Sequence, residues 1–71
     1  MMRTLSEIGR ERSRWLDRLL DYRRTLRESG GYMSDARLAG YKTAIADCEA
    51  MIAALDEEVS KRSFNNLLNL N

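Results

Sequence analysis

The sequence has no histidine, no proline, one cysteine and few aromatic residues. Without histidine, the chain lacks the side chain that most often acts as a general acid or base near neutral pH. Without proline, nothing forbids long uninterrupted helices. A single cysteine excludes a disulfide within the chain, and a lone thiol at Cys48 on an apolar track is typical of a reducing compartment. We therefore expect a helical, cytoplasmic, non-enzymatic protein with no catalytic residue, cofactor or metal.

The sequence also lacks a long apolar run and an excess of one charge. Arg3 and Glu7 follow the two initial methionines closely, and the mean hydropathy is −0.53, so we expect neither a signal peptide nor a membrane span. The net charge of +1 is too small to indicate a nucleic-acid partner by itself. The preference for arginine over lysine fits a GC-rich genome, of bacterial or phage origin.

What the sequence does contain is two coiled-coil-like apolar tracks joined by a Ser-Gly-Gly turn. Steps of three and four residues place each track on one helix face. The first track is Leu5, Ile8, Arg12, Trp15, Leu19, Tyr22 and Leu26. The second is Leu38, Tyr41, Ile45, Cys48, Ile52, Leu55 and Val59. The short turn favours antiparallel neighbours.

These patterns predict one all-α domain over residues 1–71, an antiparallel two-helix hairpin. Its expected parts are a helix at about 4–28, a turn at 29–33, a helix at about 34–62 and a short tail at 63–71. The tail is expected to be either a separate short segment or a helix turned toward a different surface. Thr4 and Glu7 have capping-box spacing, and Ser34 is the expected cap of the second helix. Ser29, Gly30 and Gly31 should end the first helix, because glycine tolerates the left-handed backbone of a C-terminal cap. Gly40, which costs about 1 kcal/mol relative to alanine inside a helix, should mark a close helix contact.

Both apolar faces are wider than one hairpin can cover. Leu16 and Leu20 widen the first face, and Ala44 and Met51 widen the second. Because paired copies with twofold symmetry are the commonest assembly, we expect a homodimer that forms a four-helix bundle. Its expected interface comprises Leu16, Leu20, Ala44, Met51 and Arg12.

Arg12 and Arg23 interrupt the first apolar face, where an unpaired charge is unfavourable. Either their stems cover neighbouring leucines while the guanidinium groups reach water, or the two residues form ion pairs. Across the hairpin, Arg12 could meet Glu49 or Asp56. The remaining arginines of this helix alternate with acidic residues, which indicates an ordinary charged surface rather than a DNA-reading stripe.

The turn region carries the expected partner site, composed of Tyr32, Met33, Tyr41, Arg23 and Arg27. Aromatic side chains with guanidinium groups around them are typical of interface hot spots. Alternatively, the tyrosine and methionine of the turn fold back onto the helix ends as a plug.

Several other residues have simpler interpretations. Trp15 and Cys48 should lie opposite each other in the core, the latter as a buried structural thiol. The acidic run 56–58 should be a solvated face beside Lys61 and Arg62. In the tail, the apolar side chains either close the open end of the bundle or dock a partner; they are Phe64, Leu67 and Leu68.

Three functional hypotheses follow. The first is a homodimeric protein-binding hairpin that inhibits or sequesters a partner protein, as a phage antagonist of a bacterial regulator or defence protein would. The second is an assembly role. Residues 12–58 have the pattern of two helices with a glycine-containing turn and no catalytic residue. This pattern resembles the co-chaperones of type III secretion needle proteins, and the resemblance implies that the chain assists the assembly of another protein. The third is a small nucleic-acid-binding regulator, which the interleaved charges disfavour.

Overall fold

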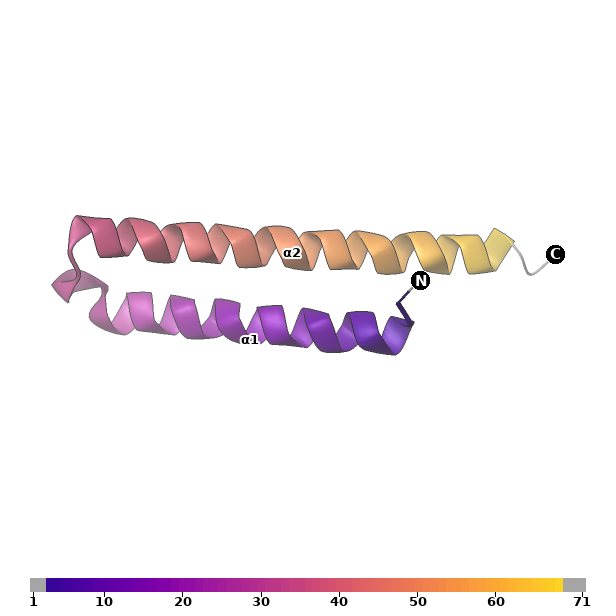
Figure 1. Cartoon of the computed structure of the whole chain (residues 1–71), viewed down its shortest axis with the longest axis horizontal. Coiled ribbons are helices and arrows are strands. Elements are labelled where there is room, and N and C mark those ends of the chain that lie inside the picture. Colours follow the sequence, from indigo (N-terminus) through magenta and orange to yellow (C-terminus); the bar gives the residue numbers. More distant parts are fainter. Residues whose placement is uncertain (1–2, 69–71) are drawn as a thin grey trace.

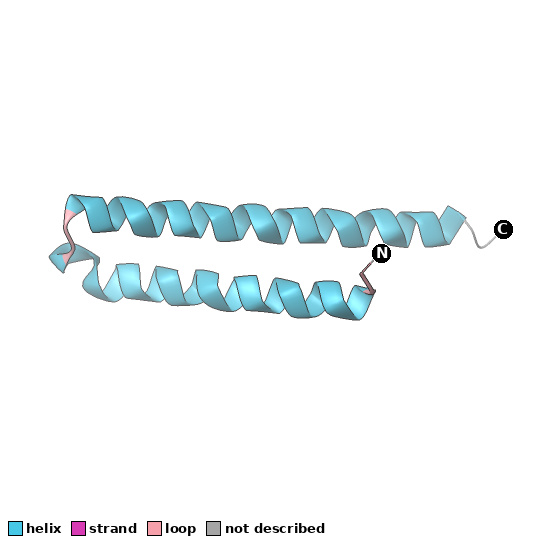
Figure 2. Ribbon diagram, viewed as in Figure 1, coloured by secondary structure: helices cyan, strands magenta, loops and turns pink. Residues whose placement is uncertain are grey.

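The computed structural model describes residues 3–68, with side chains described as far as Phe64. It contains helix α1 (Leu5–Ser29), the 3₁₀ turn η1 (Gly30–Tyr32) and helix α2 (Asp35–Leu68). The two long helices lie antiparallel and side by side (Figure 1). Figure 2 shows only short non-helical connections between them, and no strand occurs in the described region. The predicted all-α hairpin is therefore confirmed over this part of the chain.

The start of α1 follows the predicted capping chemistry. The Thr4 hydroxyl accepts a hydrogen bond from the backbone N–H of Glu7 at 3.1 Å, and it donates to the Glu7 carboxylate at 3.2 Å. One of the amides that lack a partner in the first turn is thereby satisfied. The carboxylate engages the threonine side chain here, so the two residues fix the helix start together.

The connection between the helices differs from the prediction. Gly30 has φ −58° and ψ −35°, and no described residue has a positive φ, so the predicted left-handed cap is wrong. Instead the α-helical bonding continues to Gly30, whose N–H donates to the carbonyl of Leu26, and the chain then tightens into η1, where the N–H of Met33 donates to the carbonyl of Gly30 at 3.2 Å. These bonds satisfy carbonyl groups near the helix end without reversing the handedness of the backbone.

Helix α2 begins as predicted and ends later. The Ser34 hydroxyl accepts from the N–H of Arg37 at 3.2 Å, but the helix continues to Leu68 rather than ending near residue 62. Of the two alternatives for the tail, the helical one is therefore confirmed over residues 63–68, while residues 69–71 lie outside the described region. No glycine or proline follows Gly40, so the sequence contains no strong helix stop there.

The core is a single thin seam between the helices. Its buried apolar side chains within the described region are Ile8, Leu19, Cys48 and Leu55. Trp15, predicted to lie in the core, is only half-buried at the edge of the seam. The radius of gyration is 16.5 Å, whereas a compact domain of this length has about 11 Å. The hairpin is thus elongated, and each helix is shielded from solvent only along the seam.

Two ion pairs cross the seam on one side. Arg12 donates to Asp56 at 2.7 Å, and Arg23 donates to Glu49 at 2.7 Å. The hydrogen bond and the charge of Asp56 both raise the pKa of the Arg12 guanidinium. Of the two alternatives for these arginines, ion pairing is confirmed. All four side chains remain substantially exposed, so water screens each pair and limits its contribution to stability.

Candidate functional site

The turn presents an almost fully exposed tyrosine. Tyr32 is 94% exposed, whereas Met33 beside it is half-buried. The predicted plug is therefore wrong for Tyr32, because this ring does not pack against the helix ends. Both residues border a concavity of about 330 Å³, here called the turn hollow. Its lining comprises Thr25, Ser29, Tyr32, Met33, Ser34 and Arg37.

A second concavity lies next to the first along the hairpin. This aromatic hollow has a volume of about 300 Å³ and is lined by Tyr22, Arg37, Gly40, Tyr41 and Ala44. The rings of Tyr22 and Tyr41 meet edge to face, with centroids 5.8 Å apart and an interplanar angle of 78°. Such an arrangement is favourable for aromatic pairs, and it fixes one wall of the hollow.

Gly40 has a different role from the predicted one. A Cβ atom added at this position would meet no atom within 4 Å. The predicted close contact between helices at Gly40 is therefore wrong, since nothing packs against the glycine. Its missing side chain instead leaves space in the aromatic hollow.

Arg37 connects the two hollows. Its side chain borders both of them, and it forms no ion pair or hydrogen bond within the described region. The sequence-based prediction missed this residue. A usable signal was present, because Arg37 lies four residues after Met33 and four before Tyr41, and residues at that spacing share a helix face.

The two other arginines expected at the partner site lie outside both hollows. Arg23 is engaged with Glu49 across the seam. Arg27 lies one turn farther along α1 on the same face, exposed and without an ion pair in the described region. The structure thus brings Tyr32, Met33 and Tyr41 together around Arg37, not around Arg23 and Arg27.

The five residues expected at a dimer interface do not share one surface. Leu16 and Tyr22 lie three residues before and after the buried Leu19. Around the axis of α1, they therefore point about 60° to either side of Leu19. Leu20, 54% exposed, lies one turn beyond Leu16, whereas Ala44 lies with Tyr22 in the aromatic hollow. The candidates divide into Leu16, Leu20 and Arg12 on one side, and Ala44 and Met51 on the other.

A third concavity, of about 410 Å³, surrounds Trp15 on the outer part of α1. The guanidinium carbon of Arg18 lies 5.2 Å from the centroid of the Trp15 ring, a cation–π arrangement. Both residues belong to α1, so the exposed side of the ring is covered by a side chain of its own helix. The lining mixes both charges, as the sequence predicts for this face, and comprises Arg3, Glu7, Arg10, Glu11, Arg14, Trp15 and Arg18.

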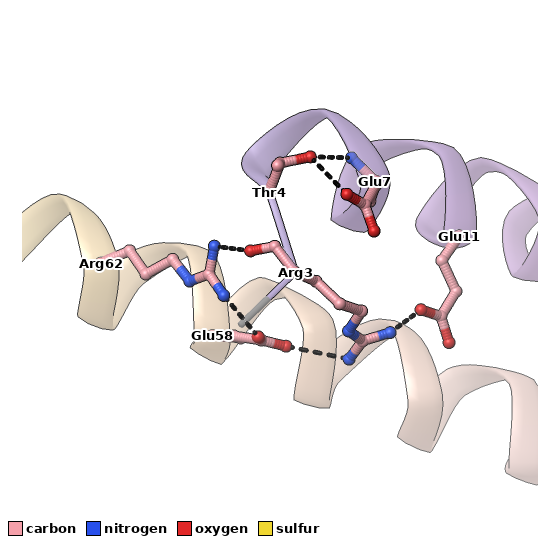
Figure 3. A network of polar contacts seen from close by, with 6 residues as sticks. All are labelled: Arg3, Thr4, Glu7, Glu11, Glu58 and Arg62. Carbon is pink, nitrogen blue, oxygen red and sulfur yellow. Dashed lines mark hydrogen bonds and ion pairs between the residues drawn. The ribbon is translucent and has the colours of Figure 1, made fainter. Parts of the chain in front are cut away.

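The open end of the hairpin is held by a polar network (Figure 3). Arg62 of α2 donates to the backbone carbonyl of Arg3 and, at 3.3 Å, to Glu58. Arg3 in turn pairs with Glu11 of α1 and, at 3.2 Å, with Glu58 of α2. The network therefore ties the start of α1 to the last turns of α2. Phe64 beyond it is 60% exposed, and the side chains of the other tail candidates, Leu67 and Leu68, lie outside the described region.

The remaining candidate groups are structural. Cys48 is buried, as predicted. Each member of the acidic run 56–58 has a basic partner, which confirms its interpretation as a solvated charged face; the partners are Arg12, Lys61, and Arg3 with Arg62. Within residues 3–68, no group of three or more histidine, cysteine, aspartate or glutamate side chains is placed to hold a metal ion.

Comparison with known proteins does not assign the chain to a family. The chain matches no protein-family model, no curated protein and no solved structure. Neither described helix contains a segment long and apolar enough to cross a membrane. Function must therefore be inferred from the surfaces described above.

Proposed function

We propose that this protein is a non-enzymatic, cytoplasmic protein-binding module that inhibits or sequesters a partner, as a phage antagonist of a bacterial regulator or defence protein would. The observation that supports this proposal is the nearly complete exposure of Tyr32 at the tip of the hairpin, where it borders the same hollow as Arg37. Tyrosine and arginine are the residues most enriched at binding hot spots. Blocking a partner surface also requires no catalytic group.

The proposal includes a homodimer. The chain exposes 5662 Å², whereas a compact monomer of 8.2 kDa exposes about 4,500 Å². The surplus of about 1,100 Å² exceeds the roughly 800 Å² that each partner contributes to a standard interface. Leu16 and the exposed Leu20 supply an apolar strip on one side of the hairpin, which a second copy would cover.

Partner binding is tested by affinity capture from a bacterial lysate, followed by titration calorimetry with the captured protein. We expect Tyr32→Ala to weaken binding by about 1–3 kcal/mol while helicity remains unchanged. Phe64→Ala is the matched control, because it removes an exposed aromatic side chain at the other end. Unchanged binding by Tyr32→Ala together with weaker binding by Phe64→Ala would move the site to the open end.

The homodimer is tested by light scattering at micromolar concentration, where we expect twice the chain mass of 8.2 kDa. Leu20→Glu should give a monomer, because it places a charge in the proposed apolar interface. A wild-type monomer that melts cooperatively at a concentration-independent temperature would disprove the dimer. A one-to-one complex with the captured partner, in place of a homodimer, would favour the assembly role of a co-chaperone.

A further inference from the structure

We infer that the aromatic hollow receives an apolar or aromatic side chain of the partner protein, and that a carboxylate next to that side chain pairs with Arg37. This inference rests on the proposed function and specifies the chemistry of the partner segment. It combines three observations: open space at Gly40, a wall formed by Tyr22 and Tyr41, and an exposed arginine, Arg37, that borders the same hollow and has no ion pair within the described region.

The space at Gly40 is the first of these observations. A glycine inside a helix is unfavourable relative to alanine, and here no packing contact requires it, since an added Cβ would meet nothing within 4 Å. The same absence contributes to a concavity of about 300 Å³. This volume lies at the lower limit of ligand pockets, so the hollow suits one side chain better than a whole cofactor.

The wall of the hollow determines what kind of group fits. Tyr22 and Tyr41 hold each other edge to face, and Ala44 and the backbone of Gly40 complete a largely apolar lining. Aromatic faces and edges favour contact with another ring or an aliphatic side chain. The lining carries no carboxylate, and the positive charge of Arg37, which borders the hollow, disfavours a second positively charged group.

Arg37 supplies the charge preference. No described carboxylate contacts its guanidinium group, so no internal ion pair must break before a ligand binds. Guanidinium groups form two parallel hydrogen bonds with carboxylates. A partner segment that presents a ring or aliphatic side chain together with a carboxylate therefore complements both the apolar lining and Arg37.

The probe for this inference is 3-phenylpropionate, which carries one aromatic ring and one carboxylate. Titration into the ¹⁵N-labelled protein should shift the amide resonances of Gly40 and Ala44 in a saturable manner. Phenethylamine, with the same ring and the opposite charge, should bind at least about tenfold more weakly because Arg37 repels it. Equal affinities for the two probes, or no shift at these amides, would overturn the inference.

Two glycine substitutions separate binding from folding. Gly40→Ala and Gly9→Ala both introduce a Cβ that meets nothing within 4 Å, so each should raise the melting temperature by about 4–8 °C. Only Gly40→Ala should weaken probe binding, and Gly40→Leu, which fills the hollow, should abolish it. Undiminished binding by Gly40→Leu would overturn the inference. Arg37→Gln should remove the preference for the carboxylate over the amine.

The captured partner distinguishes failure of this inference from failure of the proposed function. If Tyr32→Ala weakens partner binding and Gly40→Leu does not, the protein-binding function stands and the inference fails. If 3-phenylpropionate binds at Gly40 but no protein partner is captured, the chemistry of the hollow stands and the proposed function fails. If Gly40→Leu instead converts a dimer into a monomer, the hollow belongs to the dimer interface and the inference fails.

Discussion

At the open end of the hairpin, Arg3 and Arg62 both contact Glu58, and Arg3 also contacts Glu11. At the turn end, Arg27 and Arg37 contact no carboxylate within the described region. No turn joins the two helices at the open end, and there these ion pairs link α1 to α2. At the turn end the chain itself joins α1 to α2, and the side chains there are not needed to hold the helices together.

This difference indicates where binding energy is available. An arginine that already pairs with a carboxylate must lose that contact before it can bind a partner. An exposed unpaired arginine loses only hydration and side-chain freedom. The turn end also carries Tyr32 and two of the three hollows, whereas the hollow around Trp15 lies along α1 toward the open end. We therefore expect the network of Arg3, Glu58 and Arg62 to contribute stability at the open end, and the unpaired side chains of the turn end to be available for recognition.

The largest expected effect concerns the seam that supports both ends. Leu19 is 5% exposed and its neighbour Leu20 is 54% exposed, so the two positions compare the same side chain inside and outside the seam. Leu19→Ala should cost about 2–5 kcal/mol, which is comparable to the whole stability of so small a domain. Circular dichroism should show loss of most helicity at every protein concentration.

Leu20→Ala is the control for that experiment. It should leave the hairpin seam intact and mainly lower the melting temperature at low protein concentration, where a dimer dissociates. An equal loss of helicity in both variants at high concentration would show that the assignment of Leu19 to the seam is wrong. It would also remove the basis for treating the two ends separately.

Much of the hairpin could be predicted because its signals are local or periodic. The three- and four-residue spacing of the apolar residues predicted the apolar face of each helix. The caps at Thr4 and Ser34 depend on residues only three positions apart. Asp56, which pairs with Arg12, was one of the two partners expected from folding these faces about the turn. The end of α2 was predicted too early, because the change in heptad pattern near residue 62 was interpreted as a stop although no helix-breaking residue occurs there.

The candidate site was predicted less well, because it depends on the rotation of each helix about its axis. Periodicity identifies a broad apolar face but does not determine which edge of that face remains open. Tyr32, Met33 and Tyr41 were singled out from the sequence and border the two hollows, whereas Arg37, which borders both, was not. For the same reason Gly40 was expected to lie in a helix contact, although it lies beside an open hollow.

A smaller effect is expected from Glu58→Gln, which weakens the network at the open end. Glu58 contacts Arg3 and Arg62 and thereby links the two helices, whereas the adjacent Glu57 contacts only Lys61 of its own helix. Glu58→Gln should reduce the free energy of unfolding by about 1 kcal/mol, and Glu57→Gln by less than about 0.5 kcal/mol. Urea unfolding measures both, and the difference should shrink in high salt. Equal effects of the two substitutions would show that the network does not hold the open end.

The smallest expected effect is that of Arg37→Gln on stability. Because no described side chain pairs with Arg37, its replacement should change the free energy of unfolding by no more than about 0.5 kcal/mol in either direction. Arg62→Gln, at the open end, should be clearly destabilising, since Arg62 is only 17% exposed and contacts both Glu58 and the backbone of Arg3. Parallel urea titrations of the two variants compare the ends directly. A destabilised Arg37→Gln variant would mean that this guanidinium group has a partner within the protein, and the turn end would then resemble the open end.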